Sequence, residues 1–540
     1  MQTTEAARIT IIKYGQFPWF NPWISGGVPL FANPQFGLYS LPMVCGLLFG
    51  SIIGYKIALA LYLLAAFWGI YILCRKVFDT PLLTSILLGY VWAFSGYFAS
   101  RIAGHYTFFT IVFVPFILYF YLKRDVVRKS WLWLGLLIGM MINAAAHNTT
   151  IMGLAVFGLI VIFETAQRTV RIYQKNKAGS RLYTILIKDL QFFTLSALVA
   201  LVISGQRLFH TLQYLKEYPR VLFASEETIG LGNGLLAIFG PFVQYNNQPH
   251  IPEWSWMEVS AYIGFFTAIA ACISIFAIYH KPHLNVYYRL QPLTIILLGI
   301  LFFCFGMGIF AQHLSPYYLL HHLPVFSGMR VATRWLVWTS LMAIVIIALY
   351  QKKWARKLIN TCLAISAVEL AITGAPQMAS VYTIPAATYP QSQTVNQQIH
   401  YDSQRFGITY DENLTATTRS NIGQIVAGDA LIDTRNMPPV GSNTIRCDSD
   451  TCDFVLTHNA KVTYWSPNYI QLDRTATGPI ELNMNPGKDW LVNDIYPFSS
   501  MRLSEPDRKF IITDTSSKID LRIQPKLSPS WFIWKLEKKE

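Results

Sequence analysis

Long apolar runs separated by short polar loops fill residues 41–375 of this 540-residue chain, whereas residues 376–540 hold no apolar run of comparable length. A bilayer core requires roughly 20 consecutive apolar residues per helix, because lipid cannot satisfy the backbone hydrogen bonds. The pattern therefore predicts a polytopic α-helical membrane protein with about ten transmembrane helices. The expected spans are 53–74, 82–99, 107–122, 131–147, 149–165, 188–206, 259–279, 293–311, 334–350 and 357–375.

Short segments in which apolar and polar residues alternate occur in the polar C-terminal part. The expected strands are Lys461–Trp465, Asn468–Leu472, Ile480–Met484, Phe510–Thr513 and Ile519–Ile523. Period-two alternation with regular turns is typical of an antiparallel β-sandwich. We therefore expect a first outer loop with a re-entrant segment at 1–52, a transmembrane helical domain at 53–375 and an extracytoplasmic β-rich domain at 376–540.

Composition argues against the alternative of a large soluble helical core. Only 13% of the residues are charged and the mean hydropathy is +0.36, whereas soluble proteins carry about 25% charged residues. A soluble fold would also leave many apolar runs without a polar face. A membrane protein accounts for both observations.

Lys and Arg gather in alternate loops. The basic loops lie around 75–76, 123–129, 168–188, 281–289 and 352–357. The positive-inside rule makes these loops cytoplasmic, so residues 1–52 and the C-terminal domain lie outside, as an even number of spans requires. The net charge of +14 then reflects topology and contact with anionic lipid headgroups, and we predict no nucleic-acid partner.

The N-terminus conflicts with this topology, because no signal peptide or spanning segment precedes residue 40. Either the first internal helix draws the N-terminal segment across the membrane, or a further transmembrane helix lies upstream of Met1. We favour the second explanation.

A Pro- and Gly-rich motif follows the N-terminal segment. Residues 15–40 read GQFPWFNPWISGGVPLFANPQFGLYS. This segment resembles the first outer loop of YfhO-type bacterial membrane proteins, which belong to the GT-C superfamily of polyprenyl-phosphate-sugar-dependent glycosyltransferases. The matching positions are Gly15, Pro18, Asn21, Pro22, Gly27, Pro29, Ala32, Asn33, Pro34 and Gln35, while Phe20 stands where the family usually has Trp.

Looser matches extend the resemblance over most of the chain. They comprise Ala103-Gly104-His105, the segment from Glu258 to Gly264 (EVSAYIG), and Leu323-Pro324 followed by Arg330 and Arg334. The resemblance implies a GT-C-like fold and a catalytic Asp or Glu in the first outer loop. That acid usually lies well upstream of the motif, so we expect it ahead of Met1.

Among the visible residues, Glu5, His105 and Glu258 are the candidates for a base that activates an acceptor hydroxyl. Each has a structural alternative: a loop or cap role for His105, and a dipole-favoured helix start for Glu258. Arg330 and Arg334 are suited to hold the leaving phosphate through bidentate contacts. Snorkelling to the interface is their alternative.

Sugar recognition has further candidates in the loops. Asn21, Asn33 and Gln35 carry polar groups that could bind sugar hydroxyls, although the surrounding Pro and Gly residues more directly predict a rigid re-entrant loop. Trp254 and Trp256 could stack on sugar rings, but aromatic belts at membrane interfaces are commoner.

Cysteine and histidine spacing adds two expectations. Cys447 and Cys452 bracket a polar stretch in the outer domain, where oxidation is allowed, so we predict that they form a disulfide. His313, His321 and His322 lack carboxylate or Cys partners at a zinc-site spacing. We predict no structural metal site, name no certain cofactor and leave a divalent cation open.

The function expected from these observations is transfer of a sugar from a polyprenyl-phosphate donor to a glycan, lipid or protein acceptor at the outer face of the cytoplasmic (inner) membrane. The first alternative is a non-catalytic glycolipid-binding or assembly subunit of the same architecture. A transporter is less favoured, because ionisable residues within the spans would be its signature. Lys56 and Glu369 are the notable exceptions in otherwise apolar spans, and Glu369 has no partner evident from the sequence.

Overall fold

The structure is a computed structural model of the chain, which consists of two compact parts. It describes residues 2–23, 27–102, 106–145, 147–174, 179–217, 229–240, 256–280, 291–308, 315–323, 326, 329, 331–349, 353–380, 398–401, 423–426, 454–482, 484, 489–495 and 510–525.

The predicted helical membrane architecture is confirmed. Six helices within the described ranges are long and apolar enough to cross a membrane: Ser51–Val77, Leu82–Arg101, Asn148–Val170, Leu186–Lys216, Ala332–Leu349 and Ala355–Ala379. Four shorter apolar helices accompany them: Thr107–Leu122, Ser130–Asn143, Phe265–Ile278 and Pro292–Gly306. Each of the expected spans overlaps one of these helices.

The helices take the following bounds. The first half of the chain forms α1 (Gln2–Ile12), α2 (Leu41–Phe49), α3 (Ser51–Ile72), α4 (Leu82–Ala93), α5 (Gly96–Arg101), α6 (Phe113–Leu122), α7 (Ser130–Asn143), α8 (His147–Gln174) and α9 (Gly179–Glu217). The second half forms α10 (Leu231–Phe239), α11 (Trp256–Val259), α12 (Phe265–His280), α13 (Pro292–Gly306), α14 (Pro316–His321), α15 (Leu336–Leu349) and α16 (Lys353–Ser380).

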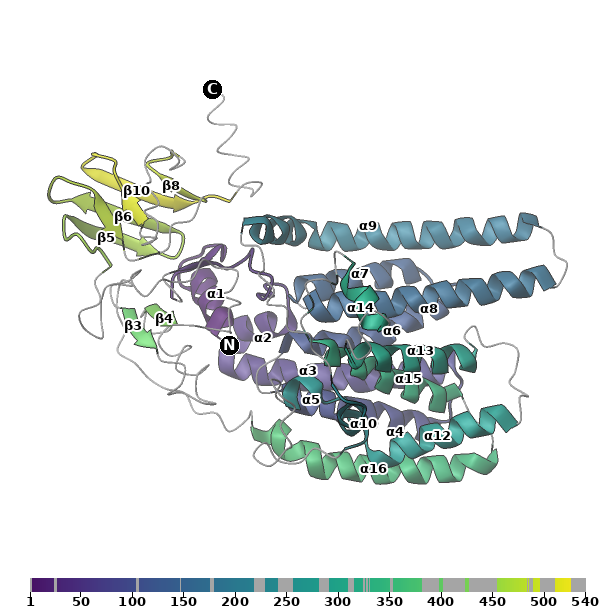
Figure 1. Cartoon of the computed structure of the whole chain (residues 1–540). Coiled ribbons are helices and arrows are strands. Elements are labelled where there is room, and N and C mark those ends of the chain that lie inside the picture. The colour runs from purple at the N-terminus through teal and green to yellow at the C-terminus, as the bar shows by residue number, and fades with distance from the viewer. Residues whose placement is uncertain are drawn as a thin grey trace. The chain divides into compact units, whose positions relative to one another are not determined.

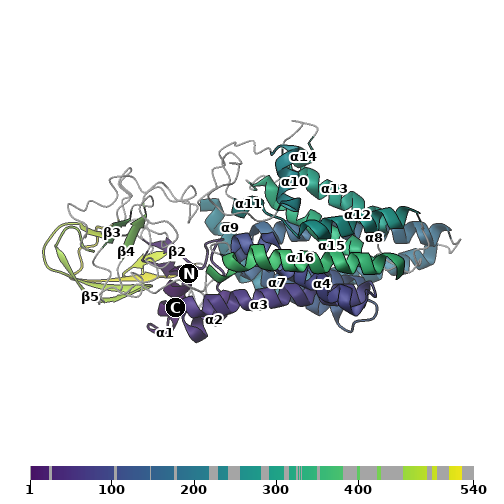
Figure 2. The ribbon, with the colours of Figure 1, turned by 90° about the horizontal axis from the view of Figure 1, so that it is seen from below.

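The two compact parts are each built from segments distant in the sequence. Unit 1 comprises Met1–Ile57, Arg207–Val221 and Ile384–Glu540, and unit 2 comprises Ala58–Gln206 and Leu222–Thr383. Unit 2 is a helical bundle in which α12 packs against α16 and α13 against α15. The helices α4, α12, α15 and α16 lie side by side in Figure 1 and again in the turned view of Figure 2.

Glycine allows one close approach in this bundle. A Cβ built on Gly135 of α7 would lie 2.5 Å from the backbone oxygen of Ser196 in α9. Any larger residue would push the two helices apart, because real Cβ atoms do not approach that closely. Small residues at helix contacts are typical of membrane bundles.

The half-buried carboxylate of Glu369 does have partners, contrary to the impression from the sequence. It accepts a hydrogen bond of 3.0 Å from the backbone N–H of Phe265 and another from the Tyr262 hydroxyl. Ser366, one turn earlier on α16, accepts from the N–H of Thr267 at 2.7 Å. Two side chains of α16 therefore satisfy free N–H groups at the start of α12, where a negative charge is favoured by the helix dipole.

In unit 1, strands form the predicted antiparallel sheet in the C-terminal part. The strands are β5 (Ala460–Ser466), β6 (Tyr469–Arg474), β7 (Ile480–Leu482), β8 (Trp490–Val492), β9 (Phe510–Ile512) and β10 (Lys518–Ile523). Their order is β5-β6-β10-β8 in a four-stranded antiparallel sheet, with β7 and β9 paired separately. Further short pairs are β1 (Phe20–Asn21) with β2 (Val28–Pro29), and the parallel pair β3 (Gln398–Tyr401) with β4 (Gly423–Val426).

The N-terminal loop and the C-terminal sheet share one hydrophobic core. Phe20 and Trp23 of the loop are buried together with Trp465 and Trp490 of the sheet. Trp23 packs edge-on against Trp465 with ring centroids 5.9 Å apart, and Phe20 packs against Trp490 at 5.4 Å. The first-loop motif is therefore folded onto the sheet from the far end of the chain.

Candidate functional site

A cluster of charged side chains lies where several helices of unit 2 end. Arg101 is the last residue of α5, Glu258 lies on α11, and Arg334 lies on the 3₁₀ turn (Ala332–Trp335) that leads into α15. Phe108, on the 3₁₀ turn before α6, has its ring centroid 4.7 Å from the Arg334 Cζ and 5.6 Å from the Arg101 Cζ. Because α6 runs from this turn to the basic loop at 123–129, the cluster lies at the opposite end of the bundle from that loop.

Glu258 and Arg334 form a bidentate ion pair. The Arg334 Nε and Nη2 groups each donate to one carboxylate oxygen at 2.8 Å. The two side chains are only 9% and 14% exposed. Parallel hydrogen bonds of this kind fix the orientation of the guanidinium as well as its position. Both carboxylate oxygens are thereby engaged in holding Arg334.

Arg101 is 1% exposed and is held by backbone carbonyls. Its Nη2 donates to the carbonyl of Glu258 at 2.9 Å, and its Nη1 donates to the carbonyls of Ser260 and Tyr97 at 3.2 Å. The Arg101 Nε and the Ser260 hydroxyl are buried and have no hydrogen-bond partner among the residues that the structure describes. Buried polar atoms of this kind need a partner, so they are the natural contacts for a polar ligand or an ordered water.

The charge balance of this cluster favours an anion. Among the described residues, Arg101 and Arg334 bring two positive charges and Glu258 brings one negative charge. In a buried site of low dielectric constant, an excess positive charge interacts more strongly with an anion than it would in water. Guanidinium groups are also the side chains best suited to phosphate geometry. The chemistry of the described cluster is therefore suited to a phosphate group.

The structure brings together two of the site residues expected from sequence, Glu258 and Arg334. It adds Arg101, which sequence reasoning missed; the available signal was a lone Arg at the end of an otherwise apolar span. His105 and Arg330 lie outside the described residues, as do Trp254 and the side chain of Trp256. Their expected roles stay predictions.

The first-loop candidates lie in unit 1 and are engaged in local turns. The Asn21 Oδ1 accepts from the Trp23 N–H at 3.1 Å, and the Asn33 Oδ1 accepts from the Gln35 N–H at 2.8 Å. Arg207 of α9 donates to the carbonyl of Asn33 at 2.5 Å. These contacts support the rigid-loop alternative for Asn21 and Asn33, since their side-chain oxygens stabilise the loop itself.

Glu5 is also engaged. Its side chain is fully buried on α1, and the Arg8 Nε and Nη2 donate to its two oxygens at 2.9 and 2.8 Å. The hydrogen bonds with Glu5 raise the pKa of Arg8, against an opposing effect of burial. Because both residues lie on α1 three positions apart, these hydrogen bonds stabilise the helix itself. Cys447 and Cys452 lie outside the described residues, so their disulfide stays a prediction.

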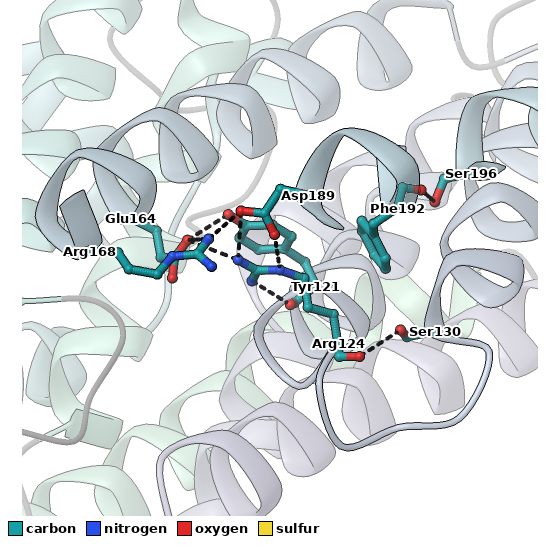
Figure 3. Close-up of polar contacts among 8 residues, drawn as sticks. All are labelled: Tyr121, Arg124, Ser130, Glu164, Arg168, Asp189, Phe192 and Ser196. Carbon is teal, nitrogen blue, oxygen red and sulfur yellow. Dashed lines mark hydrogen bonds and ion pairs between the residues drawn. The ribbon is translucent and has the colours of Figure 1, made fainter. Parts of the chain in front are cut away.

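A second charged cluster lies at the other end of unit 2, next to the basic loop (Figure 3). Arg124 of that loop donates to Asp189 of α9 at 3.0 Å and to Glu164 of α8 at 3.3 Å. Arg168 of α8 contacts the same two carboxylates at 2.5 and 3.0 Å, and the Tyr121 hydroxyl donates to Glu164 at 2.8 Å. Among the described residues, two positive and two negative charges balance here. A balanced cluster of this kind is expected to hold the contributing helices and the loop together rather than to bind a charged ligand.

The comparisons with known proteins give similarity to solved structures at low sequence identity. No family model matches the chain, and no curated protein matches it. This chain is similar to the solved structure of the arabinofuranosyltransferase AftD from Mycobacteria, at 10% identity and a TM-score of 0.47. The oligosaccharyltransferase of Archaeoglobus fulgidus is similar at 13% identity and a TM-score of 0.36. Each match covers 78% of this chain, but only 29% and 57% of the respective partner chains.

Proposed function

We propose that this protein is an integral membrane glycosyltransferase of the GT-C type, which transfers a sugar from a polyprenyl-phosphate donor at the outer face of the membrane. The observation that carries the proposal is the Arg101–Glu258–Arg334 cluster, which concentrates two guanidinium groups at the bundle end opposite the basic loop 123–129. The resemblance of the first-loop motif at 15–40 to YfhO-type proteins is the basis for proposing the GT-C type.

The cluster would act on the donor phosphate. Cleavage of the sugar–phosphate bond leaves negative charge on the phosphate oxygens, and preorganised guanidinium groups stabilise charge that develops in a transition state. Glu258 and the carbonyl groups around Arg101 would keep both guanidinium groups in place before the lipid arrives. The acceptor would be a glycan, a lipid or a protein.

One observation favours the second candidate, a non-catalytic glycolipid-binding or assembly subunit. The carboxylates of Glu5 and Glu258 are both engaged in bidentate pairs with Arg. A base must reach the proton that it removes, and neither carboxylate is poised for that step. The cluster would then bind a lipid phosphate without transferring the sugar.

The test separates binding from transfer. The full chain in nanodiscs is offered undecaprenyl phosphate, and retention is followed by native mass spectrometry. Loss of a charge-assisted hydrogen bond costs about 1.5–3 kcal/mol, so Arg101→Gln is expected to weaken retention by roughly 10- to 100-fold. Arg522→Gln, on the exposed face of β10, is the control and should bind as the wild type does.

Transfer is then assayed with a panel of undecaprenyl-phosphate sugars. Transfer by the wild type that Arg101→Gln abolishes supports the enzyme. Retention without transfer of any sugar supports the binding subunit. Equal retention by the wild type and Arg101→Gln would remove the phosphate role from this cluster.

A further inference from the structure

The four-stranded sheet of unit 1 has one exposed face, which crosses the neighbouring strands β5, β6 and β10 (Figure 1). Burial alternates along β10, and Asp520 and Arg522 are among its exposed residues. The register pairs Asp520 with Gln471 and Arg522 with Tyr469 of β6. Residues directly opposite each other point to the same side of a sheet, so these four side chains share what we call the polar sheet face.

A β-bulge adds an aromatic side chain to this face. The pairing of β5 with β6 shifts between Val462 and Tyr464, which makes Thr463 the extra residue. Without that residue, strict alternation would turn Tyr464 toward the core. With it, Tyr464 lies opposite Gln471 and is 45% exposed, while Trp465 after it is buried. Bulges re-aim side chains in this way beside functional sites.

Polar contacts on this face are organised around Asp520. Its Oδ1 accepts from the Tyr469 hydroxyl at 3.2 Å and from the Gln471 Nε2 at 3.1 Å. Its Oδ2 accepts no hydrogen bond from the part of the chain that the structure describes. The rings of Tyr464 and Tyr469 lie beside each other, with centroids 5.6 Å apart and an interplanar angle of 48°. The face therefore presents two aromatic rings next to a carboxylate that is fixed in place and still able to accept.

This combination suits a sugar. A pyranose ring has an apolar C–H face that packs against aromatic rings, and hydroxyl groups at its edge that both donate and accept. The Asp520 carboxylate can accept from such hydroxyl groups, and the Gln471 amide can do both.

The charges of the polar sheet face narrow the ligand further. Three basic and three acidic side chains lie on or beside it among the described residues: Lys461, Lys518, Arg522, Asp473, Asp494 and Asp520. A balanced face of this kind does not attract a strongly charged polymer of either sign. Protein interfaces, in turn, are depleted of charged residues at their centre. The balance therefore favours a neutral glycan.

We infer that the polar sheet face binds a neutral glycan, with a sugar ring against the rings of Tyr464 and Tyr469 and its hydroxyl groups at Asp520 and Gln471. This binding goes beyond the proposed function, because it involves unit 1 alone and no transfer step. It applies equally to an enzyme and to a binding subunit.

Saturation-transfer difference NMR on the full chain in phosphatidylcholine nanodiscs tests the inference. The neutral probes are maltohexaose, cellohexaose, mannohexaose and chitohexaose, and hexagalacturonate is the anionic control of similar length. The expected result is saturation of the ring protons of at least one neutral probe and none of hexagalacturonate. Absence of saturation in every neutral probe, or equal saturation of hexagalacturonate, would overturn the inference.

Substitutions locate the signal. Tyr464→Ala removes the ring that the bulge exposes, and Asp520→Ala removes the hydrogen-bond acceptor. Each is expected to weaken binding of the neutral probe by about tenfold. Both residues are exposed, so neither variant should unfold the sheet.

Each variant has a matched control. Tyr173→Ala on α8 removes a tyrosine that is 85% exposed in unit 2, and Lys518→Ala removes another exposed charge of β10. Both controls should bind the neutral probe as the wild type does. Undiminished saturation in folded Tyr464→Ala and Asp520→Ala proteins would exclude the polar sheet face as the binding site.

The same experiment stays separate from the proposed function. Arg101→Gln should leave the saturation unchanged, because Arg101 belongs to unit 2 and the sheet to unit 1. Tyr464→Ala, in turn, should retain undecaprenyl phosphate as the wild type does. Failure of phosphate binding and failure of glycan binding are therefore distinguishable.

Discussion

At the scale of single residues, the buried charges of the Arg101–Glu258–Arg334 cluster have two kinds of partner. Glu258 and Arg334 pair with each other, and Arg101 donates to backbone carbonyls. Arg101, Glu258 and Arg334 are nearly withdrawn from solvent, yet each has strong partners. Removing a charge from water costs several kcal/mol, and only good geometry offsets that cost. A cluster of this kind is therefore weak evidence for stability.

The Glu258–Arg334 pair gives a prediction that needs no substrate. Glu258→Gln and Arg334→Met should each destabilise the protein by about 3–5 kcal/mol, because each leaves an uncompensated buried charge. The double variant should lose less than the sum of the two single losses. Thermal unfolding of the four proteins in one detergent measures this cycle. Additive losses would mean that the two side chains are independent.

A site residue can be predicted from the sequence when it lies in a short local motif. Glu258 and Arg334 lie in short motifs at helix starts, and for this reason the sequence alone identifies them as candidate site residues. The lone Arg101 sits in no motif, and its partners Glu258 and Ser260 are 157 and 159 positions away. Such a role becomes visible only when the helices are packed.

At the scale of elements, hydropathy predicts a helix well and its ends poorly. The span expected at 188–206 continues as α9 to Glu217. Arg207 and His210 lie on one face of that extension and contact the first loop, Arg207 through a carbonyl of Phe31 that is 176 positions away. In the C-terminal part, each of the five expected strands overlaps an observed strand, three in the four-stranded sheet and two in the separate β7–β9 pair. The pattern does not predict β8, because all three of its residues are buried and show no alternation.

The cluster in Figure 3 ties three of these elements together, since its charges come from α8, α9 and the loop after α6. Asp189→Asn should destabilise the bundle by about 3–5 kcal/mol, because Arg124 and Arg168 would then share one carboxylate. Arg128→Gln, in the same loop, should stay within about 0.5 kcal/mol of the wild type. Thermal unfolding gives the comparison, and equal melting temperatures for the two variants would exclude a structural tie.

At the scale of the whole molecule, the positions of the basic loops and the number of apolar helices together predict the membrane topology. The described residues hold six long and four shorter apolar helices, which is an even number. With an even number of crossings, the segment before the first helix and the domain after the last one lie on the same side. The positive-inside rule then predicts that the basic loops, including 123–129 and 352–357, share the cytoplasmic side.

Fusions at two positions test that topology. A reporter joined after Lys357 follows the span that ends at Leu349 and should be cytoplasmic, so a fluorescent protein there should be bright and an alkaline phosphatase inactive. The same reporters joined after Glu540 follow one more span, Ala355–Ala379, and should give the reverse result. The pair is matched, because only one helix and the β-rich domain separate the two fusion points. A bright fluorescent protein at both positions would mean that the last helix does not cross the membrane, and the prediction that the β-rich domain lies outside would then be wrong.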